Sequence, residues 1–309
     1  MLMIGVAPKY IAAKGYNARE AYTKAFSEYY KNGGASQASA LIKERIATLC
    51  DIGGFTTDEL ASWDISIMLA SSANSNPTLF WFLSYIYSNP TFLTTLREEI
   101  SRAIRITDTS VTFDVSFLLK ECPILVASWQ EVLRTRAVTI SSRFVMEDTL
   151  LADQYLLRKG GVIQLVSSTN HQSSQIWGPD AASFNPSRFL PPTTDNLPKA
   201  VKKDRRDGYT PFGGGSSLCP GRNFVTMEVI GAVALFVTGY EIEKEDGGLL
   251  EVAEIKENPF GAQIRQAKKD PRVKVRRRAE WAGKKWCFDV GDGVGEGSSG
   301  LAFNAALAQ

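Results

Sequence analysis

The chain has 309 residues, enough for one large domain or two ordinary ones. Its hydrophobic share of 44%, charged share of 22% and net charge of +2 are those of a soluble globular protein, and they give no reason to expect nucleic acid as a partner. The cysteines Cys50, Cys122, Cys219 and Cys287 form no CxxC pair, which argues against a zinc site or a disulfide framework. Apolar runs are short, so the sequence as written predicts no membrane anchor.

Apolar side chains that recur every three or four residues predict helices in the first half of the chain. The first two are expected over 17–32, opened by Asn17, and over 36–50, opened by Ser36 or Ser39. A long helix should follow Thr57, with a kink at Pro77, until Asn89-Pro90 stops it and begins another helix up to about residue 104.

The second half is expected to mix helices, short strands and irregular chain. Helices are predicted over 116–134 and 221–240, and strands over 156–166, turned by Gly160-Gly161, and within 255–275. The stretch 172–218 has few periodic patterns, and a long irregular segment inside a compact domain is usually functional.

The most informative stretch is PFGGGSSLCPGR, from Pro211 to Arg222, which runs directly into the last predicted helix. Its three glycines let the backbone fold closely against a flat ligand. Cys219 comes just before the helix begins, where aligned amide groups favour the thiolate form. A thiolate is a strongly donating axial ligand for haem iron. A buried cysteine in such a loop can also be inert packing, so the order of the residues has to decide.

That order resembles the haem-binding loop of the cytochrome P-450 superfamily, F-x-x-G-x-R-x-C-x-G. Phe212, Gly215, Cys219 and Gly221 match at the family's spacing, whereas Ser217 replaces the basic residue that helps to hold a haem propionate. The resemblance implies a fold that is mainly α with a small β portion, the P-450 fold with its N-terminal part missing. It also implies haem b, with the iron bound axially by Cys219, and predicts weaker haem binding because of Ser217.

Other segments are similar to the family in the right order. Glu131 and Arg134 form an ExxR motif, and the FNPSRF segment supplies Arg188. In the family these charges form a buried triad, so a structural role is expected, with an exposed ion pair as the alternative. Arg143 matches a position where many members place an arginine on a haem propionate. His171 falls where the family has a structural His or Asn and is expected to be a hydrogen-bonding core residue.

The sequence ASSAN, from Ala70 to Asn74, stands where most members carry A-G-x-[DE]-T, whose acid and threonine deliver protons to bound dioxygen. Ala73 replaces the acid and Asn74 the threonine, and Pro77 follows. This pattern is similar to the branch with cholesterol 7α-hydroxylase, sterol 12α-hydroxylase and prostacyclin synthase. Ala70 is therefore expected at the cofactor and Asn74 in catalysis, unless Asn74 and Pro77 only break an ordinary helix.

The resemblance covers residues 1 to about 278, the C-terminal haem-binding part of a P-450 domain, and leaves 279–309 as a tail without counterpart, expected to be disordered. It implies an apolar substrate (sterol-like, lipid or secondary-metabolite), an electron donor of the NADPH–cytochrome reductase type and the endoplasmic reticulum membrane.

A basic patch for an acidic reductase is predicted just before the cysteine loop, formed by Lys202, Lys203, Arg205 and Arg206. A solvated loop is the alternative. Three functions stay open: a haem-thiolate monooxygenase, a haem-thiolate isomerase acting without a reductase, and a truncated, non-catalytic fragment.

Overall fold

The computed structural model describes residues 9–191, 193–256 and 263–291 of the chain. The chain divides into two compact units, one reaching to Asn74 and the other beginning at Ser75. The single domain predicted over 1–278 includes residues of both units and stays a prediction.

The first unit is built from three helices, α1 (Ala13–Lys31), α2 (Ala40–Ala47) and α3 (Thr57–Ser72). The two helices predicted before residue 50 are confirmed, although α1 begins before Asn17 and α2 is followed by a π-helical turn, Thr48–Ile52. Ser39 is the N-cap of α2, because its side chain accepts the amide of Ile42. Thr56 and Glu59 form a capping box that begins α3.

A buried polar network joins the three helices of this unit. The carboxylate of Asp64, only 4% exposed, accepts hydrogen bonds from the hydroxyl of Tyr30 and the guanidinium of Arg45. Burial and the neighbouring Asp64 raise the pKa of Tyr30 to about 12. Since each helix supplies one member, the network fixes α1, α2 and α3 against one another.

The long helix predicted after Thr57 is interrupted before the proline rather than kinked at it. Helix α3 ends at Ser72, and α4 runs over Ser75–Tyr87. Pro77 lies in the first turn of α4, where backbone N–H groups have no partner within the helix, so its missing N–H leaves the helix intact.

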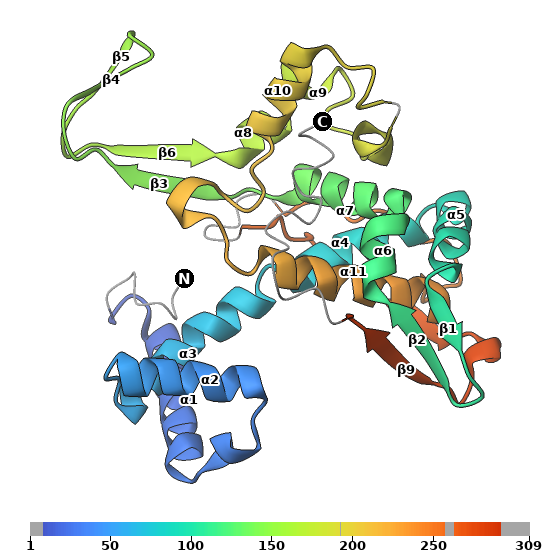
Figure 1. Cartoon of the computed structure of the whole chain (residues 1–309), viewed down its shortest axis with the longest axis horizontal. Helices are drawn as coiled ribbons and strands as arrows, with labels where there is room; N and C mark the ends of the chain where they lie inside the picture. The colour runs from blue at the N-terminus through green and yellow to red at the C-terminus, as the bar shows by residue number, and fades with distance from the viewer. Residues whose placement is uncertain (1–8, 192, 257–262, 292–309) are drawn as a thin grey trace. The chain divides into compact units, whose positions relative to one another are not determined.

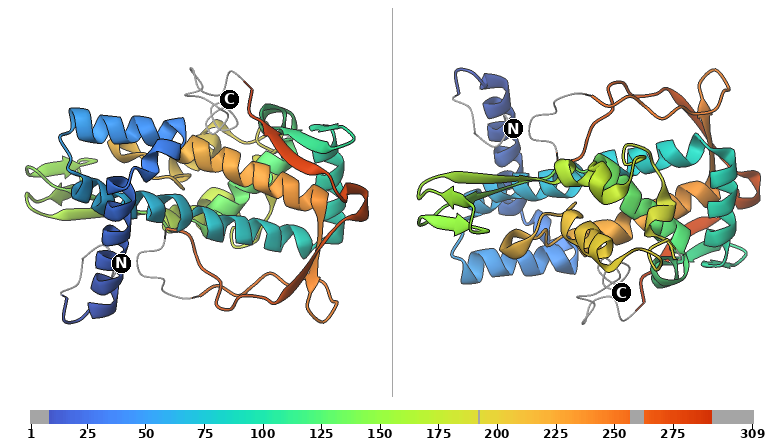
Figure 2. Two further views of the ribbon diagram at one scale, coloured as in Figure 1. Left: turned by 90° about the horizontal axis from the view of Figure 1, so that it is seen from below. Right: turned by 90° about the horizontal axis from the view of Figure 1, so that it is seen from above.

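Helices form the core of the second unit: α4, α5 (Pro90–Ser101), α6 (Val115–Glu121), α7 (Pro123–Arg136) and α11 (Arg222–Gly239). As predicted, Asn89 begins α5, since its side chain accepts the amide of Phe92 at 3.0 Å. The single helix expected over 116–134 is wrong, because Cys122-Pro123 divides it into α6 and α7. Helix α11 is confirmed, and it runs beside α4 in both views of Figure 2.

Helix α11 is the central element of this core. Its buried residues Val229, Ile230, Val233, Ala234 and Val237 pack among α4, α5, α6 and α7. Among the described residues it is the one helix whose length and composition would also suit a membrane span, with a mean hydropathy of 1.2 and 44% of its residues buried in the fold. Its packing against four other helices is that of a core helix.

The β portion is small and lies at the edges of the helical core. Strands β3 (Ile140–Phe144) and β6 (Val162–Val166) pair antiparallel, and the same ribbon continues into β4 (Thr149–Leu151) and β5 (Tyr155–Leu157), which extend away from the helices (Figure 1). Strands were predicted within 156–166, but β5 and β6 pair with β4 and β3 rather than with each other. Strands β7 (Tyr240–Lys244) and β8 (Val273–Arg277) form another pair. Of the predicted stretch 255–275, the described residues 255–256 and 263–272 form isolated bridges at Ile255, Ile264 and Ala267 rather than a strand, and 257–262 lie outside the described residues.

The segment predicted as a disordered tail contains an ordered strand. Strand β9 (Lys285–Asp289) pairs parallel with β2 (Ser110–Asp114), which pairs antiparallel with β1 (Ile104–Ile106). A Cβ atom on Gly239 of α11 would lie 2.6 Å from the ring of Trp286, and one on Gly231 would lie 3.3 Å from the ring of Phe288. These two glycines let β9 close on the core helix. The prediction of disorder is therefore wrong for 279–291, while 292–309 lie outside the described residues.

The stretch 172–218 is less irregular than predicted. It follows α8 (Ser167–His171) and contains α9 (Ser174–Trp177), α10 (Lys199–Gly208) and two 3₁₀ turns, Pro186–Phe189 and Gly215–Ser217. No apolar pattern predicted α10, seven of whose ten residues are charged.

Candidate functional site

The cysteine loop leads from α10 to the first turn of α11. Gly213 and Gly215 adopt left-handed backbone angles, with φ of +75° and +62°, which side chains rarely allow. The loop is closed by its own backbone, since the amide of Cys219 donates to the carbonyl of Phe212 at 3.1 Å and that of Leu218 to Gly215 at 3.1 Å. Cys219 is partly exposed, and a Cβ atom on Gly221 would lie 3.9 Å from its sulfur.

Side chains outside the loop hold its backbone. The hydroxyl of Thr139 donates to the carbonyl of Pro211 at 2.8 Å, and Nη2 of Arg143 donates to that of Gly214 at 3.1 Å. Arg222, in the first turn of α11, donates to the carbonyl of Cys219 at 3.1 Å. The structure thus brings the guanidinium of Arg143 against the loop, as its predicted role requires.

This loop fits a flat, anionic and largely apolar group bound to Cys219. The turns at Gly213 and Gly215 carry no side chain that would cover the loop, and Arg143 brings a cation to it. Leu218 and Phe224, on either side of Cys219 in the sequence, are 39% and 57% exposed. Phe212 is partly buried against the hydrophobic core. The residue types suit haem b, whose macrocycle is apolar and whose propionates are negative.

Glu131, Arg134 and Arg188 meet in the interior, as predicted. Glu131 and Arg134 on α7 have fully buried side chains, and that of Arg188 is 5% exposed. Arg134 donates to both oxygens of Glu131, through Nε at 2.6 Å and Nη2 at 2.8 Å, while Nε of Arg188 donates to Oε1 at 3.4 Å. The alternative of an exposed ion pair is wrong, because no member reaches solvent to a significant degree.

The remaining donors of the triad are directed to the segment that follows α8. Arg134 donates to the carbonyls of His171 and Ser183, and Arg188 to those of Trp177 and Asp180. The amide of Asn185 completes the carboxylate's partners, at 2.8 Å from Glu131. Since buried guanidinium and carboxylate groups are stable only when fully hydrogen-bonded, the triad fixes the course of residues 171–188.

Of the four basic residues before the loop, Arg205 is buried and cannot belong to the predicted patch, whereas Lys203 and Arg206 are exposed. Arg205 is 8% exposed, with Nε donating to the carbonyl of Ile176 at 3.2 Å and its guanidinium 5.2 Å from the centre of the Trp177 ring. Lys203 and Arg206 both pair with Asp207, at 2.9 and 3.1 Å. Sequence reasoning missed this inward role of Arg205, because it depends on Trp177, which lies 28 positions earlier in the chain.

Ala70 and Asn74 belong to the first unit: Ala70 lies in α3, and Asn74 lies between α3 and α4. The cysteine loop belongs to the second unit. The roles of Ala70 and Asn74 beside a bound haem therefore stay predictions.

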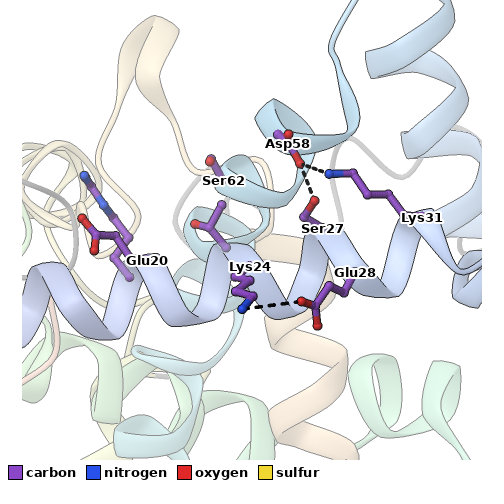
Figure 3. A pocket seen from close by; sticks show the side chains of 9 residues that line it. Glu20, Lys24, Ser27, Glu28, Lys31, Asp58 and Ser62 are labelled. Atoms are coloured by element: carbon purple, nitrogen blue, oxygen red, sulfur yellow. Dashed lines mark hydrogen bonds and ion pairs between the residues drawn. The ribbon is translucent and has the colours of Figure 1, made fainter.

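The first unit also has a polar hollow between α1 and α3, with a volume of about 790 Å³. Ser27 and Lys31 of α1 face Asp58 of α3, and Lys24 pairs with Glu28 (Figure 3). The hydrogen bonds from Ser27 and Lys31 lower the pKa of Asp58. A lining of charged and hydroxyl groups that pair with one another does not suit an apolar cofactor.

Known proteins match most of the chain. The family model described as cytochrome P-450 matches residues 15–264. A cytochrome P-450 monooxygenase of Gibberella zeae is 31% identical over 265 residues, which cover 82% of this chain and 50% of that protein. Cytochrome P-450 monooxygenase nodJ of Hypoxylon pulicicidum is 29% identical over 300 residues, covering 95% and 58%. Human 7-alpha-hydroxycholest-4-en-3-one 12-alpha-hydroxylase is 31% identical over 194 residues, covering 60% and 38%.

The chain spans about half the length of the curated relatives it matches. The predicted likeness to sterol hydroxylases is confirmed by the human 12-alpha-hydroxylase and by a hamster cholesterol 7-alpha-monooxygenase, 28% identical over 222 residues. The alignment with the nodJ protein covers 95% of the chain and so reaches past residue 278, where no counterpart was expected. With the matched family model extending over most of its residues and the cysteine loop folded as described, the chain belongs to the cytochrome P-450 family.

Proposed function

We propose that the protein to which this chain belongs is a haem-thiolate monooxygenase in which Cys219 is the axial ligand of the iron. The observation that carries the proposal is the cysteine loop, closed on itself and held by Thr139, Arg143 and Arg222 at the start of α11. When bound, haem b supplies the iron chemistry that activates dioxygen and inserts one oxygen atom into a substrate.

The residues of the loop prepare the sulfur and the surface beside it. The first amides of α11 place positive partial charge near the sulfur of Cys219. Phe212, Gly215 and Gly221 are the proposed cofactor contacts, since the phenylalanine offers an apolar surface and the glycines leave room. Arg143 is proposed to bind a propionate, a task that Ser217, as a neutral residue, cannot share as strongly.

Asn74 is proposed to hold a water molecule that carries protons, rather than to donate a proton itself. A side-chain amide has no acidic proton at neutral pH, but it donates and accepts hydrogen bonds and can hold a water molecule. The small side chain of Ala73 leaves space for that water, and Ala70 is proposed to lie against the cofactor.

An apolar substrate, an electron donor of the NADPH–cytochrome reductase type and an endoplasmic reticulum location belong to the same proposal. They are supported by the relatives, among which are sterol hydroxylases. A haem-thiolate isomerase without a reductase is the second candidate, favoured by Asn74 in the position of the threonine, because an amide can bind the oxygen of a peroxide substrate. Turnover of the whole protein with and without reductase separates the two candidates.

The central assignment is tested by reconstituting the chain with haem and recording the spectrum of the ferrous–CO form. We expect the red-shifted Soret band of thiolate-ligated haem. Cys219→Ala should lose this band, while Cys50→Ala, Cys122→Ala and Cys287→Ala, at cysteines outside the loop, should keep it. An unchanged spectrum in Cys219→Ala shows that the ligand has been assigned wrongly.

A further inference from the structure

His171 is the only histidine of the chain and is completely buried at the end of α8. Its ring lies 5.6 Å from that of Tyr209, centre to centre. Its backbone carbonyl accepts a hydrogen bond from Arg134 of the buried triad. One residue thus contacts both the triad and the chain that enters the cysteine loop.

The imidazole ring of His171 contacts the backbone just before the cysteine loop. The backbone amide of Thr210 donates to Nε2 of His171 at 3.0 Å. Because an amide can only donate, Nε2 must carry no proton, and the single proton of the neutral ring lies on Nδ1. Burial and the Arg134 cation lower the pKa of His171 to about 4, so the ring stays neutral and accepting at physiological pH.

Thr210 is the residue from which the cysteine loop starts. Its carbonyl accepts the amide of Gly213 at 3.1 Å, which forms the first turn. Two residues after Thr210, the carbonyl of Phe212 accepts the amide of Cys219. The amide of Thr210 is therefore held by His171, and its carbonyl begins the turn. That turn contains Phe212, whose carbonyl accepts the amide of Cys219.

We propose that His171 is a positioning residue for Cys219: its neutral ring holds the amide of Thr210 and so transmits the fixed position of the triad to the cysteine loop. The chain of contacts runs from Glu131 through Arg134 to the carbonyl of His171, and from its ring to Thr210. The inference rests on the proposed function only in taking Cys219 as the iron ligand.

Neither of the two other roles open to a histidine fits this geometry. A ring without exposed surface, with Nε2 already accepting a backbone amide, has no lone pair free for a metal ion on that nitrogen. A base has to take up a proton near neutral pH, whereas burial and the Arg134 cation oppose protonation of the His171 ring. A hydrogen bond with the backbone of Ala137 favours protonation but is the smallest of these three effects.

The test compares His171→Gln, whose amide oxygen can take the place of Nε2, with His171→Leu, which fills similar space but accepts nothing. The matched control is Ser167→Ala, which removes from the same helix a buried hydroxyl that has no hydrogen-bond partner among the described residues. The first readout is hydrogen–deuterium exchange of the Thr210 and Gly213 amides in the haem-free chain. The second is the fraction of ferrous–CO complex that shows the thiolate band.

We expect His171→Leu to speed exchange of the Thr210 amide roughly tenfold, the effect of one lost hydrogen bond, and to reduce the thiolate fraction. His171→Gln should restore both, and Ser167→Ala should resemble the wild type. If His171→Leu does not fold, His171→Asn replaces it, because its shorter amide does not reach Thr210.

Wild-type exchange at Thr210 in His171→Leu or His171→Asn overturns the proposal. So does a glutamine variant that behaves like leucine, because packing rather than the acceptor would then be responsible. Since exchange is measured without haem, it decides the role of His171 even if Cys219→Ala shows that the sulfur is not the iron ligand.

Discussion

Replacing Glu131 by alanine is the most direct test of the buried triad. The carboxylate accepts from Arg134 at 2.6 and 2.8 Å, from the amide of Asn185 at 2.8 Å and from Arg188 at 3.4 Å. Without it, two guanidiniums remain in a dry interior, where the described acids offer them one other ion pair, from the partly exposed Asp180 to Arg188. Breaking a buried pair in this way costs about 3–5 kcal/mol.

We expect the upper part of that range, because the amide of Asn185 also loses its acceptor, and a buried unsatisfied group costs ~1–3 kcal/mol by itself. A typical domain is stable by about 5–15 kcal/mol, so Glu131→Ala should lose a large share of its stability and of its haem. Urea unfolding followed by tryptophan fluorescence measures the change, since the Arg134 guanidinium lies 5.2 Å from the centre of the Trp177 ring.

The matched control is Glu254→Ala, which removes an acid paired with Lys268 at 2.7 Å on the surface. Exposed pairs contribute about 0–1 kcal/mol, so this variant should unfold almost as the wild type does. If Glu131→Ala lowered the free energy of unfolding no more than the control, the buried triad would not be what holds residues 171–188.

Four further outcomes are expected. The free energy of unfolding, measured by urea titration at each pH, should fall by up to about 3 kcal/mol as the pH drops from 6.5 to 4. The reason is that His171 has a pKa of about 4 in the folded chain and is protonated more readily in the unfolded chain. His171→Gln should lose this contribution to the pH dependence of the free energy of unfolding. Trp286→Ala should destabilise the chain by about 2 kcal/mol in the same assay, since its ring fills the space above Gly239. Arg143→Leu should release haem faster to a haem-scavenging protein, whereas Arg272→Leu on the surface should not. Asn74→Ala in the whole protein should release more peroxide per NADPH consumed, and an unchanged ratio would count against its place in the proton path.

The sequence predicted the parts of the fold that have local signals. Asn89-Pro90 marks a helix start by itself, and the apolar residues of α11 need no knowledge of their neighbours. Helix α10 could not be predicted, because seven of its ten residues are charged and Arg205 is buried by contacts with residues distant in the sequence, Ile176, Trp177 and Arg188. Strand β9 could not be predicted either, since its partner β2 lies far away in the chain and its flanks are rich in glycine.

Motif spacing identified Cys219 and the triad, because those residues keep fixed distances along the chain in the family. The supporting contacts are tertiary and carry no such pattern. Thr139 and His171 bind the backbone of the cysteine loop across 72 and 39 positions, and a hydroxyl or a ring in isolation does not indicate which carbonyl or amide it will meet.

The parallel pairing of β9 with β2 has a consequence for how the second unit folds. Arg105 and Asp289, which pair across this sheet, are 184 positions apart. Contacts between such distant positions slow folding, because the chain must lose the entropy of a long loop before the strands stabilise each other. The helices α4 to α7, which are neighbours in sequence, can associate first. We expect the surface of α11 at Gly231 and Gly239 to stay uncovered until Phe288 and Trp286 of β9 pack on it, which makes this face the one most exposed to aggregation during folding.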